Sequence, residues 1–212
     1  MSTRFNKVIG VGMSKTGTST LAICLDFLGF GPHQGFDLDL TDQVKRGLFT
    51  DSLKLAETAG FLEDAPWFFL YEQLDKAHPN SKFILTLRES SEAHAISNWQ
   101  HTLRKGQRVE QEKEQRIAIT KQRYETHNRA VREYFANRPN DLLEICWETN
   151  DGWDKLCPFL GVDVPLVPFP HANAKPKNAA APLIQLLNRK KIYVARMKCD
   201  QTIRRIAQTI GR

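Results

Sequence analysis

The sequence predicts a three-layer α/β fold, in which helices cover both faces of a mainly parallel sheet. Short apolar runs typical of buried strands alternate along the chain with segments of helical periodicity. The composition, with 41% hydrophobic and 25% charged residues among 212, is that of an ordinary globular domain. No repeat, low-complexity linker or domain break divides the sequence, so we expect one domain over residues 1–212.

The first predicted element is a strand, KVIGVG at residues 7–12, because it is a short β-branched run ending in glycines. A helix is expected at residues 18–28, where leucines and a cysteine recur at helical spacing before Gly29. Two further helices are expected at about residues 39–46 and 52–59.

The middle of the chain continues the alternation. Pro66 suits the first turn of a helix that ends near His78. The segment KFILTLRE, residues 82–89, is predicted to be a central strand because it is short and its apolar residues are contiguous. Helices are expected at residues 91–103 and, with many charges, at about 109–137.

The last third of the chain adds one more predicted strand, DLLEIC at residues 141–146. An apolar helical face follows at residues 153–160 and stops at Gly161. Residues 165–178 are rich in proline and asparagine, which predicts an extended loop. From about residue 182 to 212 the pattern is helical and basic.

Positive charge is concentrated at the C-terminal end. Residues 171–212 carry a net charge of +9, while the rest of the chain carries −3. Such a tail favours contact with a polyanion, which includes a phosphate-rich cofactor, a membrane surface or nucleic acid. Nucleic acid is the disfavoured partner because the sequence lacks a motif that combines stacking aromatics with basic residues. A non-catalytic polyanion-binding module remains an alternative function.

Several classes of protein are disfavoured by the sequence. The longest apolar stretches are much shorter than the roughly 20 residues of a membrane span, and glycines interrupt the apolar run near the start, unlike a signal peptide. We therefore expect a cytoplasmic protein. The cysteines form no CxxC pair, so we expect reduced thiols and no metal site. They are Cys24, Cys146, Cys157 and Cys199.

The segment GVGMSKTGTSTL, residues 10–21, is typical of an anion-binding loop between a strand and a helix. Its glycines let the backbone approach a ligand, and the first helical turn directs unpaired N–H groups at the same place. Lys15 adds a mobile cation. The hydroxyl donors are Thr16, Thr18, Ser19 and Thr20.

This anion-binding loop departs from the nucleoside triphosphatase pattern GxxxxGK[ST]. Thr18 follows Gly17 where that pattern has lysine, and Lys15 stands two places before the glycine. A triphosphatase also needs a carboxylate at the end of a neighbouring strand to help hold magnesium, whereas Arg88 occupies that place here. A P-loop kinase with a modified loop is therefore the weaker alternative.

Two segments together resemble a known family. The run KTGTST at residues 15–20, combined with LTLRES at residues 85–90 and with Ser97 and Trp99, resembles the sulfotransferases that use 3′-phosphoadenosine 5′-phosphosulfate (PAPS). Residues 64–90 and 151–174 are similar to stretches of small P-loop-like members of this family. The resemblance implies a P-loop NTPase-like sulfotransferase fold. It also implies metal-independent, in-line transfer of a sulfuryl group to an acceptor hydroxyl or amine on a small molecule or glycan.

The resemblance also implies roles for individual residues. Lys15 would contact the 5′-phosphosulfate and act in catalysis, while Arg88 and Ser97 would hold the 3′-phosphate. The rest of the cradle would be Thr16, Gly17, Thr18, Ser19 and Thr20. The family usually has a proline after the arginine and places the serine eight residues on. Here the proline is absent and the serine comes at nine, so Ser90 or Ser91 could substitute.

The acceptor's proton requires a base, for which relatives use a histidine or a carboxylate. The Asp-x-Pro segment here resembles that of small family members, and this resemblance makes Asp64 the first choice. Capping of the helix that begins at Pro66 is an equally open role for this aspartate. The reserve candidates for the base are Glu63, His33 and His101. Lys175 and Lys177 resemble in type the late basic segment that closes over the nucleotide in sulfotransferases.

Overall fold

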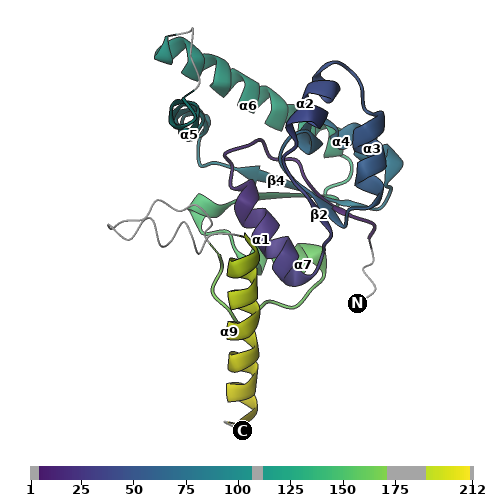
Figure 1. Ribbon diagram of the computed structural model, residues 1–212, viewed down its shortest axis with the longest axis vertical. Coiled ribbons are helices and arrows are strands. Elements are labelled where there is room, and N and C mark those ends of the chain that lie inside the picture. The colour runs from purple at the N-terminus through teal and green to yellow at the C-terminus, as the bar shows by residue number, and fades with distance from the viewer. Residues whose placement is uncertain (1–4, 107–111, 171–189, 211–212) are drawn as a thin grey trace.

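The computed structural model describes residues 5–106, 112–170 and 190–210, and it confirms the α/β fold (Figure 1). Five strands form one sheet in the order β2-β3-β1-β4-β5, and every neighbouring pair is parallel. Their carboxyl ends therefore lie along one edge of the sheet. The strands are β1 (Val8–Gly10), β2 (His33–Gln34), β3 (Phe61–Leu62), β4 (Lys82–Leu87) and β5 (Leu142–Cys146).

Two of these strands, β2 and β3, are absent from the sequence-based prediction. Each contains two residues, which is too short to give either an alternating or a continuous apolar signal. Their identity comes from pairing: Phe61 aligns with His33 on one side and with Val8 on the other. The three predicted strands are confirmed and form the other part of the sheet.

Most predicted helices are confirmed within a few residues of their expected bounds. The α-helices in the described residues are α1 (Thr18–Leu28), α2 (Leu38–Lys45), α3 (Thr50–Glu57), α4 (Tyr71–Ala77), α5 (Ser91–Arg104), α6 (Lys113–Phe135), α7 (Trp153–Leu160) and α9 (Lys190–Ile210). A short 3₁₀ helix, η2 (Trp147–Thr149), follows β5. The predicted start of α6 near residue 109 and of α9 near residue 182 falls outside the described residues.

The helix expected to begin at Pro66 is a correction. The chain forms a 3₁₀ helix there, η1 (Trp67–Phe69), and the α-helix begins only at Tyr71. Between them Leu70 has φ −105° and ψ 14°, outside the α-helical region. Trp67 and Leu70 are fully buried, so tertiary packing decides the backbone of this segment.

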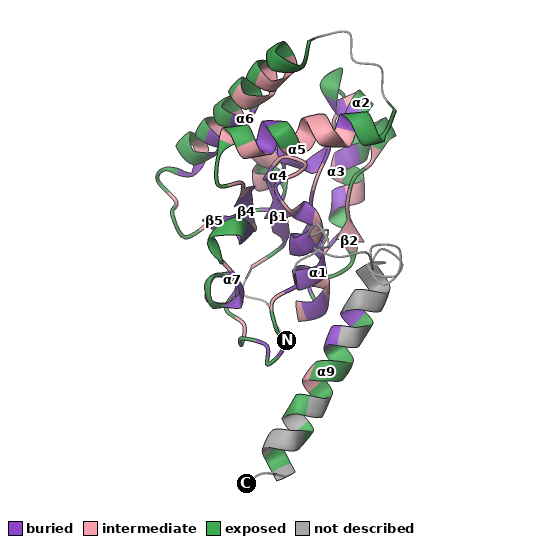
Figure 2. Cartoon of the chain, turned by 90° about the vertical axis from the view of Figure 1, so that its left-hand side faces the viewer, coloured by how far each residue is buried: buried purple, intermediate pink, exposed green. Residues whose placement is uncertain are grey.

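The core has two parts, one on each face of the sheet. On one face Val8 and Ile84 pack with α1 and α7. On the other face Ile9, Phe83 and Leu85 pack with residues of α2, α3, α4 and α6. Neighbouring strand residues thus point to opposite faces, which explains the nearly continuous apolar runs in the sequence. Figure 2 shows this buried interior, with exposed residues on the outer faces of the helices.

The C-terminal helix α9 is the basic segment expected from the sequence. Val194 and Met197 are buried in the core on the α1 side, after which the helix extends away from the sheet (Figures 1 and 2). Ile206, further along, is 54% exposed. Within the described ranges, none of the helices combines the length and apolar character required to cross a membrane. The four cysteines are free thiols, as expected.

Candidate functional site

The anion-binding loop connects β1 to α1 at the carboxyl edge of the sheet. Lys15 and Gly17 adopt left-handed conformations, with φ of 75° and 94°. A Cβ atom at Gly17 would lie 2.3 Å from Cδ1 of Trp147, and one at Gly12 would lie 2.0 Å from Oγ1 of Thr86. Close approach of neighbouring residues therefore requires glycine at both positions.

Donors are available at the start of α1. The Thr20 N–H group donates to the Gly17 carbonyl oxygen at 2.9 Å. Within the described parts of the chain, the backbone N–H groups of Gly17, Thr18 and Ser19 donate no hydrogen bond. These groups lie at the positive end of the helix dipole, which favours an anion there.

Lys15 lies among other cations. Burial lowers the pKa of its ammonium group below the ordinary value, and Arg104 lowers it further. Asp64 acts in the opposite direction, while Arg88 and Lys105 add to the lowering. Arg104 is the last residue of α5 and Lys105 follows it. The C-terminal end of this helix therefore lies close enough to Lys15 for their charges to interact. A bound polyanion would relieve the repulsion among these cations.

Arg88 follows β4 and connects the loop to η2. Its Nη1 atom donates to the carbonyl oxygen of Lys15 at 3.2 Å. Its Nε and Nη2 atoms contact the two carboxylate oxygens of Glu148 at 2.8 Å and 2.5 Å. Burial opposes ionisation of Glu148, but the bonds from Arg88 and from the Glu89 N–H group outweigh it and hold the pKa of Glu148 below its usual value. The expected phosphate-binding arginine is therefore beside the loop and carries a carboxylate partner.

Asp64 lies against the anion-binding loop. Its Oδ1 atom accepts hydrogen bonds from the Ser14 hydroxyl group and, at 2.8 Å, from the Ala65 N–H group. Its Oδ2 atom accepts one from the Thr18 hydroxyl group at 3.3 Å. The backbone carbonyl of Asp64 accepts the Phe68 N–H group at 3.2 Å. The backbone carbonyl of Asp64 thus caps the start of η1, while its carboxylate group contacts the anion-binding loop.

The reserve candidates for the base occupy two places. His33 and Glu63 pair with each other at 3.2 Å, and Glu63 is only 2% exposed. His101 lies on α5, where burial and then the charge of Lys15 lower its pKa and the charge of Asp64 raises it. His101 therefore shares the neighbourhood of the loop with Asp64.

The candidate serines lie on and before α5. Ser90 is its N-cap and accepts the Ala93 N–H group at 3.0 Å, so its side chain has a structural use. Ser91 is the first residue of the helix. Ser97 is half-buried and stands between His94 and His101 at helical spacing, which places it on the helix face that meets the loop.

His94 is a site residue that sequence analysis missed. Its ring is 1% exposed, stacks on Tyr124 with centroids 4.3 Å apart, and places Nε2 3.0 Å from the Ser14 carbonyl oxygen. Burial lowers the pKa of His94 to about 4, although the bond to Ser14 opposes this. The ring is therefore neutral at pH 7 and Nε2 carries its proton, because a carbonyl oxygen only accepts. Its helical spacing from Ser97 and His101 was the available signal.

Two further missed residues brace the loop from other elements. The hydroxyl oxygen of Thr86 on β4 lies 2.5 Å from that of Thr16. The Thr16 O–H group also donates to the Met13 carbonyl oxygen at 2.7 Å. The Trp147 ring nitrogen in η2 donates to the Gly17 carbonyl at 3.2 Å. The Thr16 hydroxyl group, predicted to contact the ligand, is thus used within the protein.

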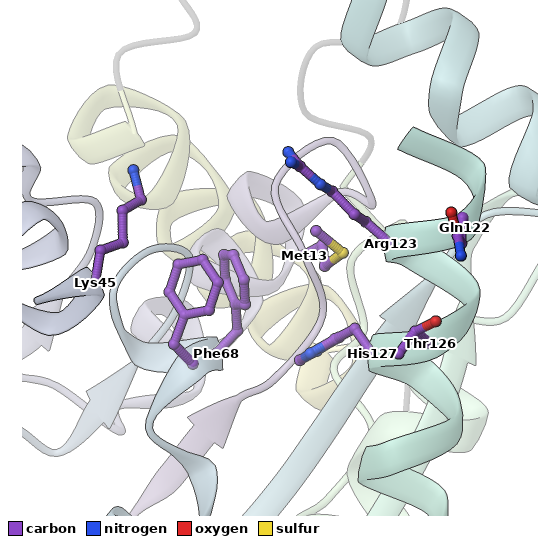
Figure 3. Close-up of a pocket in the computed structure, with 8 residues that line it drawn as sticks. Met13, Lys45, Phe68, Gln122, Arg123, Thr126 and His127 are labelled. Atoms are coloured by element: carbon purple, nitrogen blue, oxygen red, sulfur yellow. The ribbon is translucent and has the colours of Figure 1, made fainter. Parts of the chain in front are cut away.

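A cavity of about 590 Å³ opens beside the loop (Figure 3). It is bounded by Met13 of the loop, by η1, by the end of α2 and by α6, and its surface is mostly apolar. His127 on α6 belongs to its wall and places Nε2 2.7 Å from the Val11 carbonyl oxygen. Across the residues that the structure describes, no cluster of His, Cys, Asp or Glu side chains is arranged to hold a metal ion. Lys175 and Lys177 lie outside those residues.

Comparison with known proteins agrees with this geometry. A family model described as a sulfotransferase domain matches residues 7–105 and 91–178. The two matched stretches overlap at α5 and include every strand of the sheet and the whole anion-binding loop. A search of curated proteins finds no match to the chain. Because the matched residues make up most of the sequence and contain the loop with its surrounding cations, the chain belongs to the sulfotransferase domain family.

Proposed function

We propose that this sulfotransferase takes PAPS as donor and transfers its sulfuryl group to an acceptor hydroxyl or amine. One observation carries the proposal: four cations, Lys15, Arg88, Arg104 and Lys105, gather around a loop whose N–H groups are open to an anion. A donor with anionic groups at both the 5′ and 3′ positions matches this excess of positive charge better than one with a single anionic group.

The residues fit the two ends of this nucleotide. The N–H groups of Gly17, Thr18 and Ser19, together with Lys15, would hold the 5′-phosphosulfate. Arg88 would hold the 3′-phosphate, because its planar fork suits two phosphate oxygens. Ser97, on the face of α5 that meets the loop, would add a hydroxyl donor there.

The donor supplies a sulfuryl group attached to a phosphate leaving group. Lys15 would stabilise the negative charge that grows on the leaving oxygen, because it belongs to the loop that would hold the phosphosulfate. Asp64 accepts the proton of the acceptor. Its Oδ2 atom suits this role, because it receives a single long bond from Thr18 whereas Oδ1 receives two.

Thermal unfolding with nucleotides tests the proposal. Adenosine 3′,5′-bisphosphate at about 100 times its Kd, without magnesium, is expected to raise Tm by about 5–10 °C. Lys15→Ala should abolish this shift, while Lys54→Ala, an exposed lysine on α3, should keep it. Protection by ATP with magnesium alone would contradict the proposal and favour a kinase.

A further inference from the structure

Resting on the proposed function, we propose that the cavity between η1, α2 and α6 is the acceptor site. We further propose that its acceptor is a small molecule with a flat apolar body and an anionic substituent. The hydroxyl or amine that accepts the sulfuryl group would face Asp64, and the anionic group would face the mouth of the cavity.

The cavity adjoins the two segments that hold Asp64. Met13, in its wall, precedes Ser14, whose hydroxyl group donates to the Asp64 carboxylate. Phe68, in the opposite wall, donates its N–H group to the Asp64 carbonyl oxygen at 3.2 Å. The same two segments therefore contribute to the cavity wall and bond Asp64, which is why we assign the acceptor to this cavity and not to another part of the surface.

The size and surface of the cavity suit a flat apolar body. Its volume of about 590 Å³ falls within the range of about 300–1,000 Å³ that small-molecule sites occupy. Phe68 and Phe69 lie with ring centroids 4.1 Å apart, and Phe69 is 43% exposed. The His127 ring meets Phe68 edge-on at 5.4 Å. Such aromatic surfaces favour stacked or edge-on contact with another ring.

Positive charge at the rim indicates the second feature of the acceptor. Lys45 on α2 and Arg123 on α6 lie on opposite sides of the cavity, and none of the described residues that line it is acidic (Figure 3). Among the described residues, the ion pair of Lys45 is an exposed contact of 3.6 Å with Asp42, which contributes little. Within the described ranges, no carboxylate lies within 4.0 Å of the Arg123 guanidinium group. Both cations are therefore available to an anionic ligand.

Two probes with the same fused ring test the inference, namely 2-naphthol and 6-hydroxy-2-naphthoate, with binding measured by isothermal titration calorimetry. The carboxylate should make the naphthoate bind about five times more tightly than the naphthol. The double variant Lys45→Gln/Arg123→Gln should remove this difference and leave naphthol binding unchanged. The matched control is Lys54→Gln/Arg129→Gln, which changes exposed cations outside the cavity on α3 and α6.

A filled cavity provides the second arm. Thr126→Trp places a large ring on an exposed wall position and should abolish binding of both probes without lowering Tm. Probe binding that survives Thr126→Trp would overturn the site, and equal affinities of the two probes would overturn the anionic substituent. Lys15→Ala separates this inference from the donor proposal, because it should lose adenosine 3′,5′-bisphosphate and keep the naphthoate.

Discussion

The anion-binding loop and helix α9 are held to the protein in contrasting ways. The loop is fixed from several directions: Thr86 lies beneath it, His94 and Arg88 bond its carbonyl groups, and Trp147 bonds its end. Helix α9 is anchored by apolar residues near its start and then leaves the body (Figure 1). Polar cross-links fix atoms at defined places, as a reacting site requires. Among the described side chains of α9, the two buried apolar ones, Val194 and Met197, attach the helix without fixing polar atoms.

The largest effect is expected where the loop meets β4. In Gly12→Ala the new Cβ would lie 2.0 Å from the Thr86 hydroxyl oxygen and 2.5 Å from the Thr86 carbonyl oxygen. Because one of these atoms is backbone, the clash should lower the free energy of unfolding by about 3 kcal/mol, measured by urea denaturation. Gly31→Ala is the control, since its Cβ would meet nothing nearer than 3.8 Å. Equal stabilities of the two variants would contradict a tightly packed loop.

A pH dependence should follow from His94. Its folded-state pKa of about 4 lies below the ordinary 6.5, so only the unfolded chain gains a proton there as pH falls between these values. The free energy of unfolding should therefore decrease from pH 6.5 to 4, by up to about 3 kcal/mol from this residue. His94→Gln should reduce the slope without removing it, because the pKa values of His78 and His127 are also lowered. An unchanged slope in His94→Gln would contradict a lowered pKa of His94 in the folded protein.

The anchor of α9 should have a smaller but measurable effect. Met197 is 6% exposed and packs in the core on the α1 side, so Met197→Ala should cost about 2 kcal/mol. Ile206→Ala, on the part of α9 that is exposed, should change stability by less than about 0.5 kcal/mol. Urea denaturation of both variants measures the difference. A similar cost at both positions would mean that α9 is attached along its length.

The smallest effect is expected at the ion pair between Arg88 and Glu148. The carboxylate occupies the guanidinium fork that the proposed 3′-phosphate needs. Glu148→Gln should therefore bind adenosine 3′,5′-bisphosphate about fivefold more tightly, as measured by calorimetry. Adenosine 5′-phosphate, which lacks the 3′-phosphate, should bind with unchanged affinity. Weaker binding of the bisphosphate would instead mean that Glu148 positions Arg88.

The sequence predicted what local patterns determine. Helical periodicity and apolar runs located three strands and most helices, and the glycine, hydroxyl and lysine pattern located the anion-binding loop. The strands β2 and β3 were not predicted, because each has two residues and is a strand only through its pairing with neighbouring strands. The helix expected at Pro66 was wrong because buried aromatic side chains set the backbone of η1.

The site divides in the same way. Lys15, Arg88 and Asp64 were predicted from their segments, and the structure brings them together, although their roles stay predictions. His94 and Glu148 were not predicted, because their contacts join parts of the chain about 60 to 80 positions apart. The helical spacing of His94 from Ser97 and His101 places it on one face of α5, but no local pattern reports which distant residues that face contacts.

The hydrogen bond from Arg88 to the Lys15 carbonyl has one more consequence. The guanidinium group that would grip one end of a nucleotide also fixes the backbone of the lysine that would serve the other end. A ligand that drew Arg88 away from the loop would break this hydrogen bond, so binding at one end would be linked to Lys15 at the other end through a single contact. A donor that carries the 3′-phosphate and one that lacks it would then leave Lys15 in different positions before the sulfuryl group is transferred.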